Sequence, residues 1–166
     1  REKGVPVGAQ NFFSGDGSMS HTGEISVQML ANLGVKSVLV GHSERRALGE
    51  DDLLINQKVL SALKESLSVV LCIGEEKRDL DGFYLTALAS QIEKGLAKVS
   101  KKSISQISIA YEPIWAIGKN AIREATPEES EEMAIFIKKI LADISGKSHK
   151  NVRIIYGGSV TTNNAE

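Results

Sequence analysis

Short β-branched segments alternate with longer amphipathic segments five times along this chain, and this alternation constrains its fold more than any other feature. Most of the short segments are apolar along their whole length, which is typical of strands covered on both faces in a parallel sheet. The strand candidates span residues 5–9, 37–41, 68–73, 107–111 and 152–156. Repeated strand–helix–strand units of this kind predict an α/β protein with right-handed crossovers and a parallel sheet.

The segments between the strands carry caps and apolar stripes that are typical of helices. The clearest start is Thr126-Pro127-Glu128-Glu129, which supplies an N-cap, a proline at the first helical position and a capping-box glutamate. Gly146 is expected to end that helix. The other expected helices begin after Ser26, after Asp51 or Asp52, near Leu85 with apolar positions as far as Val99, and at residues 163–166.

Two architectures fit this alternation, an open doubly wound sheet and a closed barrel. A doubly wound nucleotide-binding sheet usually has a glycine-rich phosphate motif after a strand. Neither G-x-G-x-x-G nor G-x-x-x-x-G-K-[ST] occurs in this sequence, which favours the barrel. A chain of 166 residues is expected to form one domain, here spanning residues 1–166.

Composition excludes several classes of function. The formal net charge of −1 and the scattered basic residues argue against a nucleic-acid partner or an anionic membrane surface. The longest apolar run, residues 69–73, is far too short to span a bilayer, and no signal peptide is expected. Cys72 is the single cysteine, so an intramolecular disulfide is excluded and a cytoplasmic location is expected. The three histidines lack metal-ligand spacing, so no metal is expected.

Polar or glycine-rich groups follow all five strand candidates. Because the carboxyl ends of parallel strands meet at one face, these groups are expected to lie together and to form the active face. In chain order they are Gln10-Asn11, Gly41-His42-Ser43-Glu44-Arg45-Arg46, Gly74-Glu75, Glu112-Pro113-Ile114-Trp115 and Gly157-Gly158-Ser159.

Glu112 and His42 are the candidates for acid–base chemistry. A carboxylate beside Ile114 and Trp115 would be partly desolvated and would act as a better base, although a solvated or lysine-paired glutamate fits the same pattern. A neutral imidazole at His42 could donate a hydrogen bond to a carbonyl and pass a proton between two oxygens. A structural histidine satisfied by the backbone is the alternative for His42.

Two glycine-containing segments complete the candidate site. In Tyr156-Gly157-Gly158-Ser159-Val160, backbone N–H groups and a hydroxyl could form an anion-binding concavity, or the segment could be a plain turn. Ala116-Ile117-Gly118 lies in a long strand-to-helix loop, which is either a lid or a simple surface connection. A base, an electrophile, a phosphate cradle and a lid on one face suit proton abstraction next to a carbonyl in a phosphorylated substrate.

Six blocks in this order and near this spacing resemble the triosephosphate isomerase family along the whole chain. They are Gly8-Ala9-Gln10-Asn11, Thr22-Gly23-Glu24, Gly41 to Arg46, Leu71 to Glu75, Ala110 to Gly118 and Tyr156 to Val160. The resemblance implies a TIM-type βα barrel that is incomplete here, with about five parallel strands and flanking helices that match the family's third to seventh strands.

The resemblance also implies an activity and a set of roles. The expected reaction interconverts dihydroxyacetone phosphate and D-glyceraldehyde 3-phosphate through an enediol(ate), without cofactor or metal. Glu112 matches the general base and His42 the neutral electrophilic histidine, a pair for which this family is a standard example. Gly118 and Ser159 match donors to the substrate phosphate. Supporting positions are Asn11, Glu44, Tyr156, Gly157 and Gly158, and Pro113-Ile114-Trp115 matches the first hinge of the lid.

Partners follow from the same resemblance: a small phosphorylated triose as substrate, and further copies of the chain in a homo-oligomer, a dimer or larger. Thr22 matches the tip of a loop that, in the family, inserts into the partner subunit. No nucleic-acid or membrane partner is expected.

Departures from the family pattern bear on activity. The 166 residues include neither the family's first strand, with its active-site lysine, nor its eighth strand, with the glycine pair of the phosphate site. The lid, residues 118–125, is longer than usual, and residues 74–82 form a shorter connection. The chain is expected to be a fragment, to be completed by other chains, or to close imperfectly, and the sequence leaves these open. An inactive barrel fragment that binds sugar phosphate or only assembles with other chains is the competing function.

Overall fold

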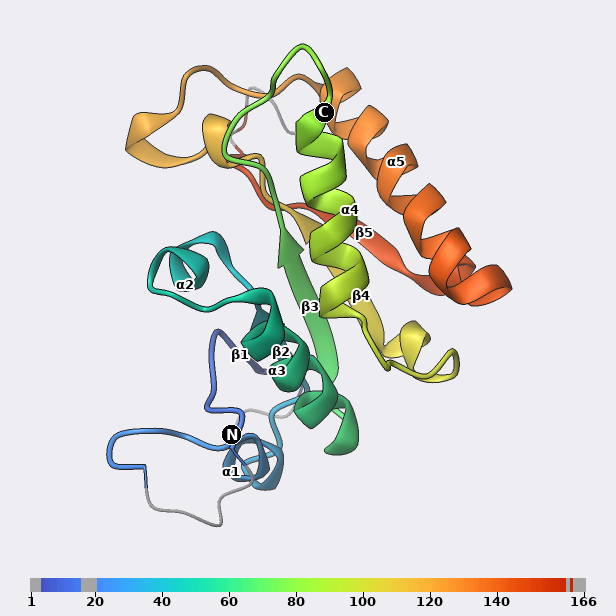
Figure 1. The fold of residues 1–166 in the computed structure, drawn as a ribbon. Helices are drawn as coiled ribbons and strands as arrows, with labels where there is room; N and C mark the ends of the chain where they lie inside the picture. The colour runs from blue at the N-terminus through green and yellow to red at the C-terminus, as the bar shows by residue number, and fades with distance from the viewer. Residues whose placement is uncertain (1–3, 16–20, 161, 163–166) are drawn as a thin grey trace.

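A computed structural model describes residues 4–15, 21–160 and 162 of this protein. Within these residues, five strands form one sheet in the order β1-β2-β3-β4-β5, and every neighbouring pair is parallel (Figure 1). The strands are β1 (Gly8–Ala9), β2 (Ser37–Val40), β3 (Ser68–Ile73), β4 (Ile107–Tyr111) and β5 (Arg153–Tyr156).

The strand order distinguishes the two architectures that the sequence left open. Each strand pairs beside the one that precedes it in the chain, with Val38 opposite Val69 and Val69 opposite Ile107. A doubly wound sheet reverses direction at a switch point, whereas a barrel adds strands in sequence around its axis. The sheet is therefore an incomplete TIM-type βα barrel, as predicted.

Helices connect the strands, and the three longest lie on one side of the sheet (Figure 1). The α-helices are α1 (Val27–Asn32), α2 (Ser43–Ala47), α3 (Asp52–Lys64), α4 (Phe83–Gly95) and α5 (Pro127–Ser145). Single turns of 3₁₀-helix are η1 (Ser103–Gln106), η2 (Ile114–Ala116), η3 (Gly118–Asn120) and η4 (Gly146–Asn151). Across the described part of the chain, no helix has both the length and the apolar character needed to cross a membrane.

The predicted caps explain where the main helices begin. The side chains of Ser26 and Asp51 accept hydrogen bonds from backbone N–H groups in the first turns of α1 and α3. At α5, Thr126 and Glu129 form a reciprocal capping box, and Pro127 is the first helical residue. These caps satisfy donors that have no partner inside a helix, so they fix the point at which each helix leaves the loop before it.

The core lies between the sheet and these helices. Every contributing helix presents an apolar stripe to strand residues that are themselves fully covered, and each buried aliphatic side chain stabilises the fold by about 1.5–3 kcal/mol. The central members are Ile55, Val59, Leu88, Ile92, Met133, Ile137, Val69, Leu71 and Ile109. This packed layer holds the strand ends, and hence the residues after them, in fixed relative positions.

Several predicted elements differ from the structure in their bounds, and the strands predicted over residues 37–41 and 152–156 are each one residue shorter, at Ser37–Val40 and Arg153–Tyr156. The first strand was predicted over residues 5–9, but only Gly8–Ala9 is paired, because Pro6 has no N–H to donate and, in the described chain, β1 pairs only with β2. The helix predicted from near Leu85 to near Val99 is α4, and it ends at Gly95. Lys98, just before Val99, has a positive φ, which is incompatible with an α-helix. The short helix α2 was not predicted, because it has no apolar stripe. Residues 163–166, expected to begin a helix, lie outside the described residues.

Candidate active site

Glu112 follows the last residue of β4, and its backbone is held from the side of β3. Its N–H donates to the carbonyl of Ile73 at 2.7 Å, and on the other side the N–H of Gly157 donates to the carbonyl of Tyr111 at 2.7 Å. A side chain at Gly74 would place Cβ 1.8 Å from the Glu112 carbonyl oxygen, so only glycine fits there. The Glu112 residue is 4% exposed. Its carboxylate is thus buried and fixed at the carboxyl edge of the sheet.

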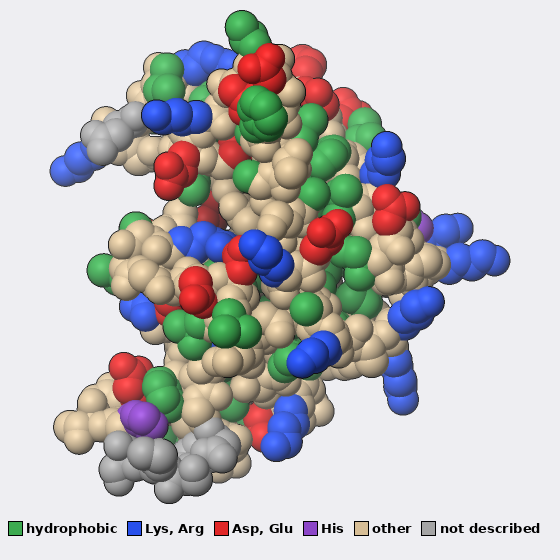
Figure 2. Space-filling view, viewed as in Figure 1, with side chains coloured by type: hydrophobic (Ala, Val, Ile, Leu, Met, Phe, Trp, Pro, Cys, Tyr) green, Lys and Arg blue, Asp and Glu red, His purple; other side chains and the backbone are tan. Residues whose placement is uncertain are grey.

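The Glu112 carboxylate reaches across to the segment that follows β2. Its Oε2 accepts a hydrogen bond from the Ser43 N–H at 2.9 Å, and its Oε1 lies 3.4 Å from Nε2 of His42. The predicted base and the predicted electrophile are therefore neighbours. Figure 1 shows the carboxyl end of β3 pointing up toward the loop before α5, and Figure 2 shows an indented outline between that loop and the α2 segment.

The hydrogen bonding of His42 defines its tautomer. His42 is the N-cap residue of α2, and its Nδ1 accepts a hydrogen bond from the Glu44 N–H at 3.2 Å. A nitrogen that accepts from a backbone N–H carries no proton itself, so the neutral ring carries its proton on Nε2. The hydrogen bond from the Glu44 N–H therefore does more than hold the ring in place. It leaves Nε2–H, which lies beside the Glu112 carboxylate, as the hydrogen-bond donor of the neutral ring.

A cavity of about 170 Å³ opens beside His42. Two predicted supporting residues, Asn11 and Glu44, line it together with His42 and Arg45. Because a ring N–H, an amide and a carboxylate meet at this cavity, it suits a small polar molecule rather than an apolar one.

The glycine loop after β5 also borders Glu112. A Cβ at Gly157 would lie 2.9 Å from Cγ of the buried Glu112, so this position favours glycine. A Cβ at Gly158 would lie 2.3 Å from the end of the Tyr156 side chain, so that ring would have to move. The rings of Tyr156 and Tyr111 are neighbours, with their centroids 6.5 Å apart. The predicted loop thus lies directly against the candidate base. Gly118, in the predicted lid, has a φ of +71°, a conformation that favours glycine.

Glu75 holds the beginning of the lid, a role that the sequence did not predict. Its Oε1 accepts hydrogen bonds from Tyr111 Oη at 2.7 Å, Trp115 Nε1 at 2.8 Å and Arg78 Nε at 3.2 Å. Its backbone carbonyl accepts from the Ile114 N–H at 3.1 Å. Burial and the charge of Glu75 raise the pKa of Tyr111, so its hydroxyl remains a donor. The only sequence signal was a polar residue directly after a buried strand.

Glu129, in the first turn of α5, forms ion pairs with two arginines. Its Oε1 accepts from Arg123 Nη2 at 2.6 Å and from Arg78 Nη1 at 3.2 Å, and its Oε2 accepts from Arg123 Nη1 at 2.8 Å. Oε2 also accepts from the Thr126 N–H at 2.9 Å as part of the capping box. The hydrogen bonds from Arg123 are the largest of several effects that lower the pKa of Glu129 to about 2.

This shift predicts acid sensitivity of the α5 start. Because the pKa of Glu129 is about 2 in the folded protein and 4.5 as an ordinary side chain, its contribution is complete above pH 4.5 and is lost as the pH falls toward 2. We expect urea unfolding at a series of pH values to show a steeper loss of stability below pH 4.5 in the wild type than in Glu129→Gln. Glu132→Gln, at an exposed position of the same helix, is the control and should retain the wild-type slope. Equal slopes in the wild type and Glu129→Gln would contradict this role.

Cys72 lies at the end of β3 close to the candidate base. Burial is the main cause that raises the pKa of its thiol, and the charge of Glu112 and a hydrogen bond to it act in the same direction. The thiol therefore stays protonated and unreactive. It is a donor beside Glu112 rather than a nucleophile.

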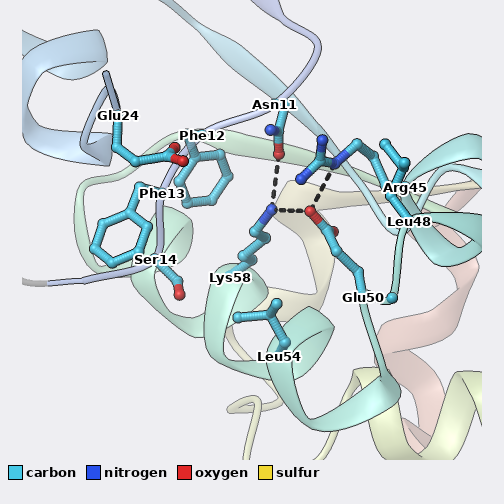
Figure 3. Close-up of a pocket in the computed structure, with 11 residues that line it drawn as sticks. Asn11, Phe12, Phe13, Ser14, Glu24, Arg45, Leu48, Glu50, Leu54 and Lys58 are labelled. Atoms are coloured by element: carbon cyan, nitrogen blue, oxygen red, sulfur yellow. Dashed lines mark hydrogen bonds and ion pairs between the residues drawn. The ribbon is translucent and has the colours of Figure 1, made fainter. Parts of the chain in front are cut away.

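A buried ion pair supports the segment between β2 and α3. Nζ of Lys58 lies 2.5 Å from Glu50 Oε1 and 2.7 Å from Asn11 Oδ1, while Arg45 Nε lies 2.7 Å from the same Glu50 oxygen (Figure 3). Burial alone would raise the pKa of Glu50, but Lys58 and Arg45 outweigh it and hold the pKa below its ordinary value. Sequence reasoning selected Asn11 but missed Lys58, because an isolated lysine in a helix usually faces solvent.

The fold and the site together define a class: a βα-barrel protein with a buried carboxylate beside an imidazole at the carboxyl edge of its strands. The sequence model of the family Triosephosphate isomerase matches residues 1–166. The chain belongs to the triosephosphate isomerase family.

Curated relatives carry that family name. The chain is 45% identical to the triosephosphate isomerase of Treponema denticola over 164 residues, covering 97% of this chain and 64% of the relative. It is 42% identical to that of Lawsonia intracellularis over 163 residues, with the same two coverages. It is 41% identical to that of Chloroherpeton thalassium over 169 residues, covering 99% of this chain and 66% of the relative. The chain therefore spans slightly less than two thirds of the length of these relatives.

Proposed function

We propose that this protein interconverts dihydroxyacetone phosphate and D-glyceraldehyde 3-phosphate. The observation that carries the proposal is the contact between the Glu112 carboxylate and the imidazole of His42 at the carboxyl edge of the sheet. The names of the relatives support the same reaction. The reaction moves protons between neighbouring carbon and oxygen atoms and needs no net oxidation, so it requires no redox cofactor.

In the proposed mechanism, Glu112 acts as the base. Its carboxylate removes a proton from the carbon next to the substrate carbonyl, and the electron pair of that C–H bond forms the C=C bond of an enediolate. Protonated Glu112, which can exchange its proton with solvent, then donates a proton to the neighbouring carbon and gives the isomer. Burial of the carboxylate favours this step because the base does not have to shed a full hydration shell.

His42 acts on the oxygen atoms. Its Nε2–H donates to the carbonyl oxygen and stabilises the negative charge that develops there. Because Nδ1 already accepts the Glu44 N–H, the neutral ring presents one defined donor. The same ring nitrogen can pass a proton between the two substrate oxygens while Glu112 moves the proton between the carbons.

The remaining predicted residues surround this pair in the proposal. Gly118 and Ser159 donate to the substrate phosphate, and Tyr156, Gly157 and Gly158 shape the loop that presents Ser159. Asn11 and Glu44 support the cavity beside His42. The positions of the glycines against Glu112 and Tyr156 are consistent with a loop that approaches a ligand closely.

We further propose that the site works in one barrel domain within a homo-oligomer, a dimer or larger, in the cytoplasm. Residues 21–25, which include Thr22, are exposed, and this exposure supports such a contact. The cation that the family supplies from its first strand would approach the cavity bounded by Asn11 and His42, where it could balance the charge of the enediolate.

An isomerase assay on purified protein tests the proposal. We expect activity above the buffer rate in the wild type, and a loss of about 10²- to 10³-fold in kcat for His42→Gln, because one preorganised donor to the developing oxyanion is removed. His149→Gln, at a partly exposed histidine after α5 and far along the chain from Glu112, is the matched control and should keep wild-type activity. A wild-type rate no higher than buffer, in a sample with native circular dichroism, would contradict the proposed function.

A further inference from the structure

Arg123 lies within the lid, and its guanidinium connects the hinge before the lid to the helix after it. Its Cζ lies 4.7 Å from the centroid of the Trp115 ring, at the start of the lid. Its two terminal nitrogens bind both oxygens of Glu129, at 2.6 and 2.8 Å, in the helix that follows the lid. The backbone agrees with this arrangement, because the Ile122 N–H donates to the Trp115 carbonyl at 2.8 Å.

Trp115 is the element that connects Arg123 to the candidate base. The indole is 6% exposed, and Nε1 donates to Glu75. Its ring also lies beneath the guanidinium of Arg78, whose Cζ is 5.2 Å from the centroid. Only Pro113 and Ile114 separate Trp115 from Glu112 in the chain. Any movement of the Trp115 backbone is therefore transmitted to Glu112 over two residues.

We propose that Arg123 is a positioning residue that fastens the lid to Trp115 and α5 and thereby keeps Glu112 in place. The expected effect of Arg123 on kcat rests on the proposed isomerase function, whereas its expected effect on the lid does not. The bidentate pair with Glu129 fixes the direction of the guanidinium plane, which an ammonium group could not do. The stacking contact then ties that plane to the indole. Arg123 touches neither Glu112 nor His42 in the described contacts, so it acts through the lid.

Hydrogen exchange of the Ile122 amide measures the fastening directly, without any need for activity. We expect exchange in Arg123→Gln to be about tenfold faster than in the wild type, because an ion pair and a cation–π contact are lost together. Arg123→Lys keeps the charge but loses the bidentate geometry of the guanidinium, so it should give an intermediate exchange rate. Arg153→Gln, at an exposed arginine of β5, is the control and should leave the Ile122 rate unchanged.

The kinetic measurement on the same variants tests the positioning role. We expect kcat to fall severalfold in Arg123→Gln with little change in KM, and Arg123→Lys to recover part of the loss, because the interaction serves the base and not the bound substrate. If the wild-type protein has no isomerase activity but Ile122 still exchanges faster in Arg123→Gln, the fastening role stands and only the proposed function fails.

Two results would overturn the inference. One is an unchanged Ile122 exchange rate in Arg123→Gln. The other is an equal acceleration at Ile122 and at Ile92, a fully buried residue of α4, because equal acceleration means that the whole protein has been destabilised. In an active enzyme, a change confined to KM would assign Arg123 to substrate binding instead.

Discussion

Replacing Glu112 by aspartate is expected to lower isomerase turnover by about 10²- to 10⁴-fold, the usual contribution of a positioned general base. The shorter side chain withdraws the carboxylate from the site, where Oε2 now accepts the Ser43 N–H at 2.9 Å and Oε1 lies 3.4 Å from His42 Nε2. The substitution keeps the charge and the backbone bonds of residue 112, so the fold should persist. Steady-state kinetics on the purified variant measure the effect.

Glu93→Asp is the matched control for this prediction. Glu93 is an exposed glutamate of α4, so the same loss of one methylene should leave turnover unchanged there. Circular dichroism and the urea midpoint of both variants should match the wild type. Wild-type turnover in Glu112→Asp would exclude Glu112 as the base.

Replacing Lys58 by methionine is expected to destabilise the protein by about 1.5–3 kcal/mol, the usual cost of losing a hydrogen bond to a charged group, because Arg45 Nε, 2.7 Å from the same Glu50 oxygen, remains as a partner. The side chains of Lys58 and Glu50 are each 5% exposed, and within the described residues Oε2 of Glu50 has no hydrogen-bond partner. Figure 3 shows Lys58 between Asn11 and Glu50, so the substitution also removes the contact that orients Asn11. Urea denaturation measures the free energy of unfolding.

Two further variants make the Lys58 prediction specific. Lys64→Met, at an exposed lysine in the last turn of α3, should change the free energy of unfolding by less than about 0.5 kcal/mol. The double variant Lys58→Met with Glu50→Gln should recover part of the loss, because it also removes the buried carboxylate charge that Arg45 alone would otherwise balance. A Lys58→Met protein as stable as the wild type would show that the pair does not stabilise the fold.

The central part of the fold was predictable from sequence because local signals and burial agree there. The predicted β3 and β4 have the bounds that the structure gives them, since most residues of both strands are apolar and buried. The capping box of α5 was also predicted residue by residue. The first strand was predicted too long, over residues 5–9, and the five-residue α2 was not predicted, because neither contains enough covered residues to give a clear hydrophobic periodicity.

The candidate site was predictable to the extent that each residue follows a strand. Glu112 and His42 were selected on that basis, and the parallel sheet places them together. The charged clusters were not predictable, because Glu129, Arg78 and Glu75 meet only after helices and loops have packed, and charged residues in sequence usually face solvent. The unusual length of the lid was visible in the sequence, but the stacking of Arg123 on Trp115 required the structure.

Incorporation of solvent deuterium tests most directly whether Glu112 moves the proton. A protonated Glu112 exchanges with solvent during the lifetime of the enediolate, so triose phosphate converted in deuterated buffer should gain deuterium on the carbon next to the carbonyl. We predict label at that carbon with the wild type and, with Glu112→Gln, no more than buffer alone gives. Isomerisation by the wild type without any label, or equal labelling by Glu112→Gln, would contradict proton transfer through Glu112.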